Sequence, residues 1–152
     1  MTTRDTDRGF RRILGALRKG AASMVSVGWF PDAEHESIPT AGIAVAHELG
    51  VPESNLPARP MIGAVVDQNQ TAYREKLREL WGQVVIGKMT VESALTIFGA
   101  RVEADLKRWI TTGPHVPLSP KTIQRKGSSR PLIDTGVMRD QVMNRVVIGK
   151  FR

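Results

Sequence analysis

The sequence predicts an α+β fold in which a small sheet of a few strands is packed by two long helices and an N-terminal helix. Two segments, about 61–86 and 90–112, repeat apolar residues every three or four positions, as helices that bury one face do. Two shorter segments, 24–30 and 143–148, are rich in β-branched residues and are typical of strands. Strands and helices do not alternate regularly, so a parallel α/β sheet is not expected.

The N-terminal segment, residues 1–20, predicts an amphipathic helix. Between about Thr3 and Lys19 its apolar residues at helical spacing are Phe10, Ile13, Leu14 and Leu17. Arginine and lysine occupy the other faces, and we expect Gly20 to end the helix. The strand predicted over 24–30 follows, and Pro31-Asp32 ends it.

The next part of the chain reads as connections between the main elements. Residues 32–40 predict an acidic loop, and residues 41–49 predict a short apolar segment closed by Gly50. Residues 52–60 contain three prolines and predict a structured linker.

The two long helices have clear end signals. Gly87 is the expected stop of the first, and Thr90 is the expected N-cap of the second. Gly113-Pro114 ends the second helix. The side chains expected in the core of the helices include Trp81, Phe98, Leu106 and Trp109.

Residues 113–131 predict a basic loop, with one helical turn possible after Ser119. Its cations are Lys121, Arg125, Lys126 and Arg130, and it has no acid. These cations are suited to contact phosphates; the alternative is that the loop is only exposed to solvent.

Asp134-Thr135-Gly136 predicts an N-cap or tight turn before 137–141. The final strand is expected to pair with residues 24–30 or with a neighbouring chain.

Length and composition predict a single domain over residues 1–152. Hydrophobic residues make up 41% and charged residues 24%, near the globular norm. The formal net charge is +7, which favours a polyanionic neighbour such as nucleic acid. The charge is +4 over residues 1–20, −4 over 21–100 and +7 over 101–152, so copies of the chain can attract one another through unlike regions.

Several classes of protein are not expected. The chain has no cysteine, which removes disulfides, thiolate metal sites and cysteine nucleophiles and suits a reducing cytoplasm. Its longest apolar runs are about six residues, short of the ~20 that span a bilayer, and no secretory signal is visible. No membrane association is expected.

No enzyme, metal or cofactor is expected either. Residues 82–88 resemble a phosphate-binding loop, but Met89 stands where a hydroxyl should hold magnesium. His35-Glu36 and His47-Glu48 lack a second histidine four residues on, and no nucleophile elbow is present.

Four sequence pieces carry a family resemblance. They are His47-Glu48-Leu49-Gly50, Leu56-Pro57-Ala58-Arg59-Pro60-Met61, Pro117-Leu118-Ser119-Pro120-Lys121-Thr122-Ile123 and the run from Lys126 to Asp140, KGSSRPLIDTGVMRD. In this order the chain resembles the neck proteins of tailed bacteriophages and Mu-like prophages, the tail-completion or head-tail joining group of phage virion morphogenesis proteins. The resemblance covers about residues 20–150. Such proteins commonly have Phe at positions 49 and 61, Leu at 138 and Ser at 141, where this chain has Leu, Met, Met and Gln.

The resemblance implies a structural virion protein without enzymatic activity. Its copies would form a ring, commonly sixfold, at the junction of tail tube and capsid connector, where DNA passes; extended loops would serve ring assembly. Tail completion, tail terminator and connector all remain open. The chain would be made in the bacterial host cytoplasm and act in the virion, contacting connector and tail-tube proteins and, transiently, phage DNA.

Two sets of residues are the candidate sites. The expected subunit interface comprises Arg59, Pro60, Asp134, Thr135 and Arg139; the alternative for Arg59 and Asp134 is that they hold their own loops. The basic loop is expected at the DNA channel or the subunit interface. The competing function is a nonspecific DNA-binding module, monomeric or dimeric, which rests on the net charge alone.

Overall fold

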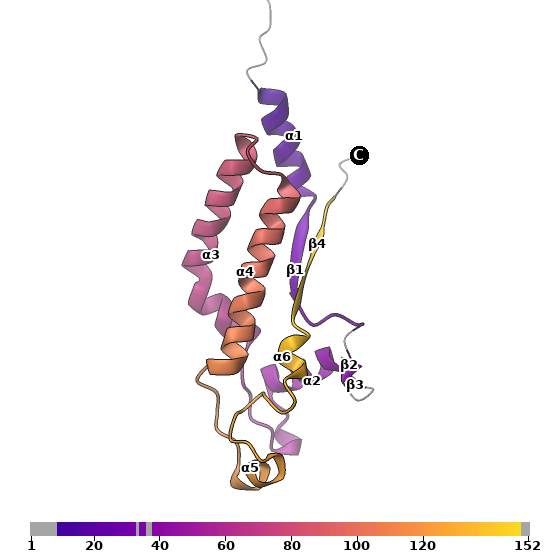
Figure 1. Cartoon of the computed structure of the whole chain (residues 1–152), viewed down its shortest axis with the longest axis vertical. Coiled ribbons are helices and arrows are strands. Elements are labelled where there is room, and N and C mark those ends of the chain that lie inside the picture. Colours follow the sequence, from indigo (N-terminus) through magenta and orange to yellow (C-terminus); the bar gives the residue numbers. More distant parts are fainter. Residues whose placement is uncertain (1–8, 33, 36–37, 150–152) are drawn as a thin grey trace, which may run out of the picture. The chain divides into compact units, whose positions relative to one another are not determined.

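The computed structural model describes residues 9–32, 34–35 and 38–149 and has the predicted α+β architecture (Figure 1). The chain divides into two compact units. Unit 1 comprises residues up to Ser26, Thr71–Gly99 and the C-terminal residues from Arg145; unit 2 comprises Val27–Gln70 and Ala100–Asn144. The elements α3, α4, β1 and β4 each contribute residues to both units, and the prediction of a single domain remains a prediction.

The two long helices are α3, Ile62–Val85, and α4, Val91–Thr112, close to the predicted ranges. Gly87 ends the turn after α3 with a φ of 78°, the left-handed conformation that suits glycine. Thr90 caps α4, because its hydroxyl accepts a hydrogen bond from the Ser93 N–H at 3.0 Å. Both predicted end signals are confirmed.

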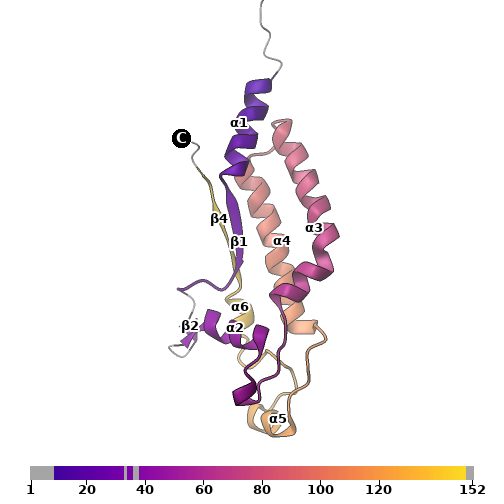
Figure 2. The ribbon, with the colours of Figure 1, turned by 180° about the vertical axis from the view of Figure 1, so that it is seen from behind.

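Unit 1 is built around an apolar core between the two helices, which lie side by side in both views (Figures 1 and 2). Its buried members are Leu80, Val84, Val91, Ala94 and Leu95. Trp81 and Phe98 pack against this cluster but are only partly buried, and the Phe98 ring meets Tyr73 edge-on at 5.6 Å. Two predicted core residues belong to unit 2: Leu106 is buried, whereas Trp109 is half-buried. Large aromatic rings often keep one edge in water.

The N-terminal helix α1 spans Phe10–Ala21, and residues 3–8 of the predicted helix lie outside the described residues. The predicted stop at Gly20 is wrong, because the helix runs one residue further. Gly20 serves packing instead: a Cβ there would overlap the Trp81 ring. Ala16 packs on the core, whereas Phe10 and Leu17 stay exposed.

Strand β1, Met24–Gly28, pairs with the final strand β4, Met143–Val147, in a two-stranded antiparallel sheet. This is the first of the two pairings expected for the last strand, the one with residues 24–30 of the same chain. Val25 and Val146 lean on the core of unit 1. Their neighbours Met24 and Val147 remain exposed, as the two-residue period of a strand requires.

Unit 2 contains the shorter elements. The predicted acidic loop at 32–40 instead contains two short strands, β2 (Glu34–His35) and β3 (Ile38–Pro39), which pair antiparallel. Each has only two residues, too few to produce an alternating pattern in the sequence. The apolar segment at 41–49 is the helix α2, Thr40–Leu49.

The linker and C-terminal loops of unit 2 contain three further short helices. The 3-10 helix η1, Pro52–Ser54, lies between Val51 and Leu56, which form an isolated antiparallel bridge. The predicted basic loop contains a seven-residue helix, α5 (Pro120–Lys126), longer than the single turn expected. The turn at 134–136 precedes α6, Val137–Asp140, as expected. Across the described residues, no helix has the length and apolar character to cross a membrane.

Candidate functional site

Arg59 ties together three segments of unit 2. Its backbone N–H donates to the His47 carbonyl at 2.7 Å. Its guanidinium donates through Nε to the Val116 carbonyl at 2.9 Å and through Nη2 to the Pro117 carbonyl at 3.4 Å. Only 3% of the residue is exposed, and burial lowers the pKa of Arg59 from its ordinary value. The guanidinium is therefore a fixed cation whose donors hold residues 116–117 in place.

Glu48 joins the end of α2 to the start of α3. One carboxylate oxygen accepts hydrogen bonds from the N–H groups of Met61, at 2.5 Å, and Ile62, at 3.0 Å; the other accepts from Gly63 at 3.0 Å. These N–H groups lack partners within the helix, and a negative charge is favoured at a helix N-terminus. The carboxylate thus caps α3 from a distant element.

Gly50 lets the chain turn back between these segments. Its φ of 76° favours glycine, and a Cβ there would come within 2.7 Å of the Ala58 nitrogen. Two of the sequence pieces, 47–50 and 56–61, therefore pack directly on each other.

The basic segment is ordered around α5. The Ser119 hydroxyl caps the helix by accepting from the Thr122 N–H at 3.2 Å. Lys126 donates to the carbonyls of Arg130, at 3.0 Å, and Ile133, at 2.5 Å, and so closes the loop that follows. Lys121, Arg125 and Arg130 are exposed.

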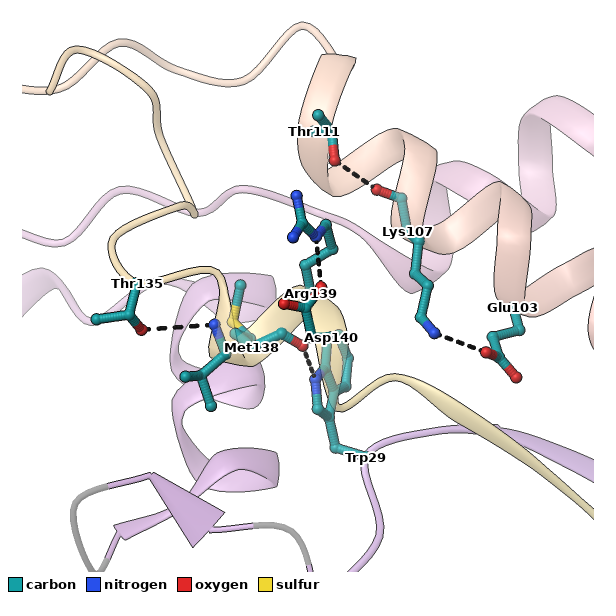
Figure 3. Close-up of polar contacts among 9 residues, drawn as sticks. Trp29, Glu103, Lys107, Thr111, Thr135, Met138, Arg139 and Asp140 are labelled. Carbon is teal, nitrogen blue, oxygen red and sulfur yellow. Dashed lines mark hydrogen bonds and ion pairs between the residues drawn. The ribbon is translucent and has the colours of Figure 1, made fainter.

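Figure 3 shows two further predicted residues, Thr135 in the turn before α6 and Arg139 in α6. Asp134 and Thr135 are exposed, and the Thr135 hydroxyl accepts from the Val137 N–H at 3.5 Å. The Trp29 indole N–H donates to the Met138 carbonyl at 2.6 Å (Figure 3).

Arg139 and Asp140 form an ion pair at 2.7 Å on the surface of α6 (Figure 3). Their hydrogen bond raises the pKa of Arg139 and lowers the pKa of Asp140. Arg139 therefore reaches a partner within its own helix.

A hollow of about 900 Å³ lies among these segments, and all its lining residues belong to unit 2. All four sequence pieces that carry the family resemblance contribute to its lining. The contributions are His47 from the first, Leu56, Pro57 and Arg59 from the second, residues 117–119 and Thr122 from the third, and Lys126, Leu132 and residues 134–138 from the fourth. Hydrogen bonds of Glu48 and Arg59 join the first piece to the second and the second to the third.

The lining is positively charged. Arg59, Arg125 and Lys126 contribute cations, and Asp134 is the one carboxylate among the described lining residues. His47 is neutral near pH 7, because burial and then the charges of Arg59 and Lys126 lower its pKa. The His47 Nδ1 atom is buried and has no hydrogen-bond partner within the described structure.

The structure brings together five of the nine predicted site residues. Arg59, Asp134, Thr135, Arg125 and Lys126 line the hollow. Pro60, Arg139, Lys121 and Arg130 do not line it, and the Pro60 carbonyl accepts from the Trp109 indole N–H at 3.0 Å. Whether any of the nine contacts another subunit or DNA remains a prediction.

Sequence reasoning missed the roles of His47 and Glu48. Both residues were visible in the sequence, as an incomplete metal motif and as part of the first sequence piece, but neither pattern indicates their hydrogen bonds. Among the described residues, no group of three or more potential metal-ligating side chains comes close enough together to hold an ion.

Comparisons with protein-family models, curated proteins and solved structures found no match to this chain.

Proposed function

We propose that the chain is a structural protein of the bacteriophage neck whose copies assemble into a ring around the DNA channel at the head-tail junction. In this role it joins or completes the tail and performs no catalysis. One observation supports this proposal above the others: the four sequence pieces that resemble neck proteins, spread over residues 47–140, line a single hollow. Hydrogen bonds of Glu48 and Arg59 join the first three of these pieces, as expected for one functional surface.

The exposed apolar side chains support assembly. In unit 1, Phe10 is 68% exposed and Val147 is 56% exposed; in unit 2, Leu49 is 73% exposed. A ring of identical subunits would bury such side chains at every interface.

The second candidate, a nonspecific DNA-binding module, is favoured by the exposed cations of the basic segment. Lys121, Arg125 and Arg130 have no ion-pair partner among the described residues. Such cations release counterions on binding DNA, so affinity would fall steeply with salt. A ring that surrounds DNA needs only weak attraction of this kind.

The mass of the purified chain in solution and its affinity for a duplex separate the two functions. The neck proposal predicts a closed ring of identical subunits and weak duplex affinity. A monomer or dimer that binds duplex tightly, with an affinity that falls steeply with salt, would favour the second function and contradict the first.

A double variant sharpens this test. Replacing Lys121 and Arg130 by Gln should reduce duplex affinity and leave the ring intact. The matched control replaces Arg74 and Arg78, two exposed cations of α3, by Gln. Equal losses of affinity in both variants would show that the basic segment has no special relation to DNA.

A further inference from the structure

The hollow of unit 2 has the charge of a receptor for carboxylates. Arg125 and Lys126 belong to its lining together with the buried, hydrogen-bonded guanidinium of Arg59, and Asp134 is the one carboxylate among the described lining residues. The orphan Nδ1 of His47 adds a buried polar atom that lacks a partner among the described residues. A buried polar atom without a partner is costly, and an incoming polar group would relieve that cost.

The rest of the lining favours a peptide over a nucleic acid. Ile43, Leu56, Leu118 and Met138 contribute apolar side chains to the same hollow. Concave sites with apolar walls and a few placed polar groups suit a segment that carries both kinds of side chain. A duplex offers a convex row of phosphates and no apolar side chain.

The chain itself contains a segment with this composition. Residues 31–39 carry the acids Asp32, Glu34 and Glu36 within five positions, flanked by a proline at each end. Ile38 is 54% exposed, and the pairing of β2 with β3 orders residues 34–35 and 38–39 before binding. Order before binding lowers the entropy lost on binding. No described residue of 31–39 lines the hollow of its own chain.

We propose that the hollow of one copy binds the acidic segment 31–39 of a second copy. Carboxylates of the segment meet Arg125 and Lys126, and its apolar side chains meet the apolar wall. The donor segment and the receptor hollow are different surfaces, so the contact is heterologous and can close into a ring. The inference rests on the proposed ring and names the contact that builds it.

Binding of a synthetic peptide with residues 30–40 to the full chain tests the contact directly. At protein concentrations below self-association, the fluorescently labelled peptide should bind with an affinity that falls with salt. A control peptide with Asn at 32 and Gln at 34 and 36 should bind on the order of tenfold more weakly or not at all, since charged hydrogen bonds are lost. Equal binding of the two peptides overturns the proposal.

Variants of the hollow locate the site. R125E should weaken peptide binding at least as much as removal of the peptide's charges, whereas R74E on α3 should leave it unchanged. R125Q replaces R125E if the reversed charge impairs folding, as judged by circular dichroism. Unchanged peptide binding in the Arg125 variant overturns the proposal. The proposal is also overturned if a 20-base-pair duplex displaces the labelled peptide and an unlabelled copy of the peptide does not.

Ring formation by the full chain separates this inference from the proposed function. R125E and the double variant E34K/E36K should each abolish rings, and the triple variant should restore them in part. Rings that persist in every variant contradict the inference and leave the neck function standing. A wild-type chain that forms no ring contradicts the neck function, whatever the peptide does.

Discussion

Unit 1 and unit 2 differ in how far directed hydrogen bonds add to apolar burial. Unit 1 relies on apolar side chains between α3 and α4, with Leu80 and Val84 each 3% exposed. Unit 2 also buries apolar side chains, among them Met61, Ile110 and Val142, but its short elements are joined in addition by side chains that bond to backbone, as those of Glu48 and Arg59 do. Apolar burial is nondirectional and gives a generic scaffold, whereas directed hydrogen bonds fix loops in one arrangement. The unit with the directed bonds contains the hollow.

The largest effect is expected in the core of unit 1. Leu80→Ala should lower the free energy of unfolding by about 2–5 kcal/mol, because it removes a buried side chain and leaves a cavity. Denaturant unfolding measures this loss. Leu17→Ala, at a position 53% exposed, is the control and should change stability by less than about 0.5 kcal/mol. Equal effects at the two positions would contradict the assigned core.

The next effect should come from the polar bonds of unit 2. Glu48→Ala leaves three N–H groups at the start of α3 without their acceptor, and we expect a loss of about 1–3 kcal/mol. Glu48→Gln keeps one acceptor oxygen and should lose less. The exposed Glu53 supplies the matched control, Glu53→Ala. If the Glu48→Ala chain were as stable as the control, the claim that directed hydrogen bonds stabilise unit 2 would be wrong.

His47 should make the stability of the folded chain depend on pH. Its pKa is lowered by burial and by Arg59 and Lys126, so below about pH 6.5 the unfolded chain binds more protons than the folded chain. Stability is then complete above that pH and falls as the pH drops toward the folded-state pKa, by at most about 1.4 kcal/mol per pH unit. Denaturant unfolding between pH 7.5 and 5.5 should show this slope in the wild type and a shallower one in His47→Gln. Identical slopes would contradict the prediction.

The smallest effect is expected at the cap of α4. Thr90→Ala removes the acceptor for the Ser93 N–H and should cost about 1 kcal/mol, whereas Thr90→Ser keeps the acceptor and should cost little. Thermal unfolding of the two variants measures the difference. If Thr90→Ala destabilised the chain more than Leu80→Ala, the account of unit 1 as held mainly by apolar burial would be wrong.

The same contrast explains which elements could be predicted from the sequence. Periodicity located α3 and α4 because their apolar residues recur over many turns, and Gly87 and Thr90 marked their ends. It missed the pairing of β2 with β3, whose strands are too short to carry a pattern. The sequence also predicted that α1 ends at Gly20. A glycine that lets the Trp81 ring approach closely cannot be distinguished in the sequence from a glycine that ends a helix.

The hollow could be predicted only in part. Arg59, Asp134 and the basic segment stood out as unusual residues in turns, but their convergence depends on contacts between distant positions. Arg59 bonds to carbonyls 57 and 58 residues further along the chain, and no local pattern records such pairs. His47 and Glu48 act through a carbonyl and a carboxylate aimed at a later segment, so their roles became visible only in the fold.

Under the neck proposal a tailed phage encodes this chain, and electron cryomicroscopy of the virions of that phage tests the central claim most directly. The neck proposal predicts a closed ring of copies at the head-tail junction, with the hollow of unit 2 facing the adjacent copy and DNA passing through the centre. A neck whose density leaves no place for this chain, or virions that lack the chain, would contradict it.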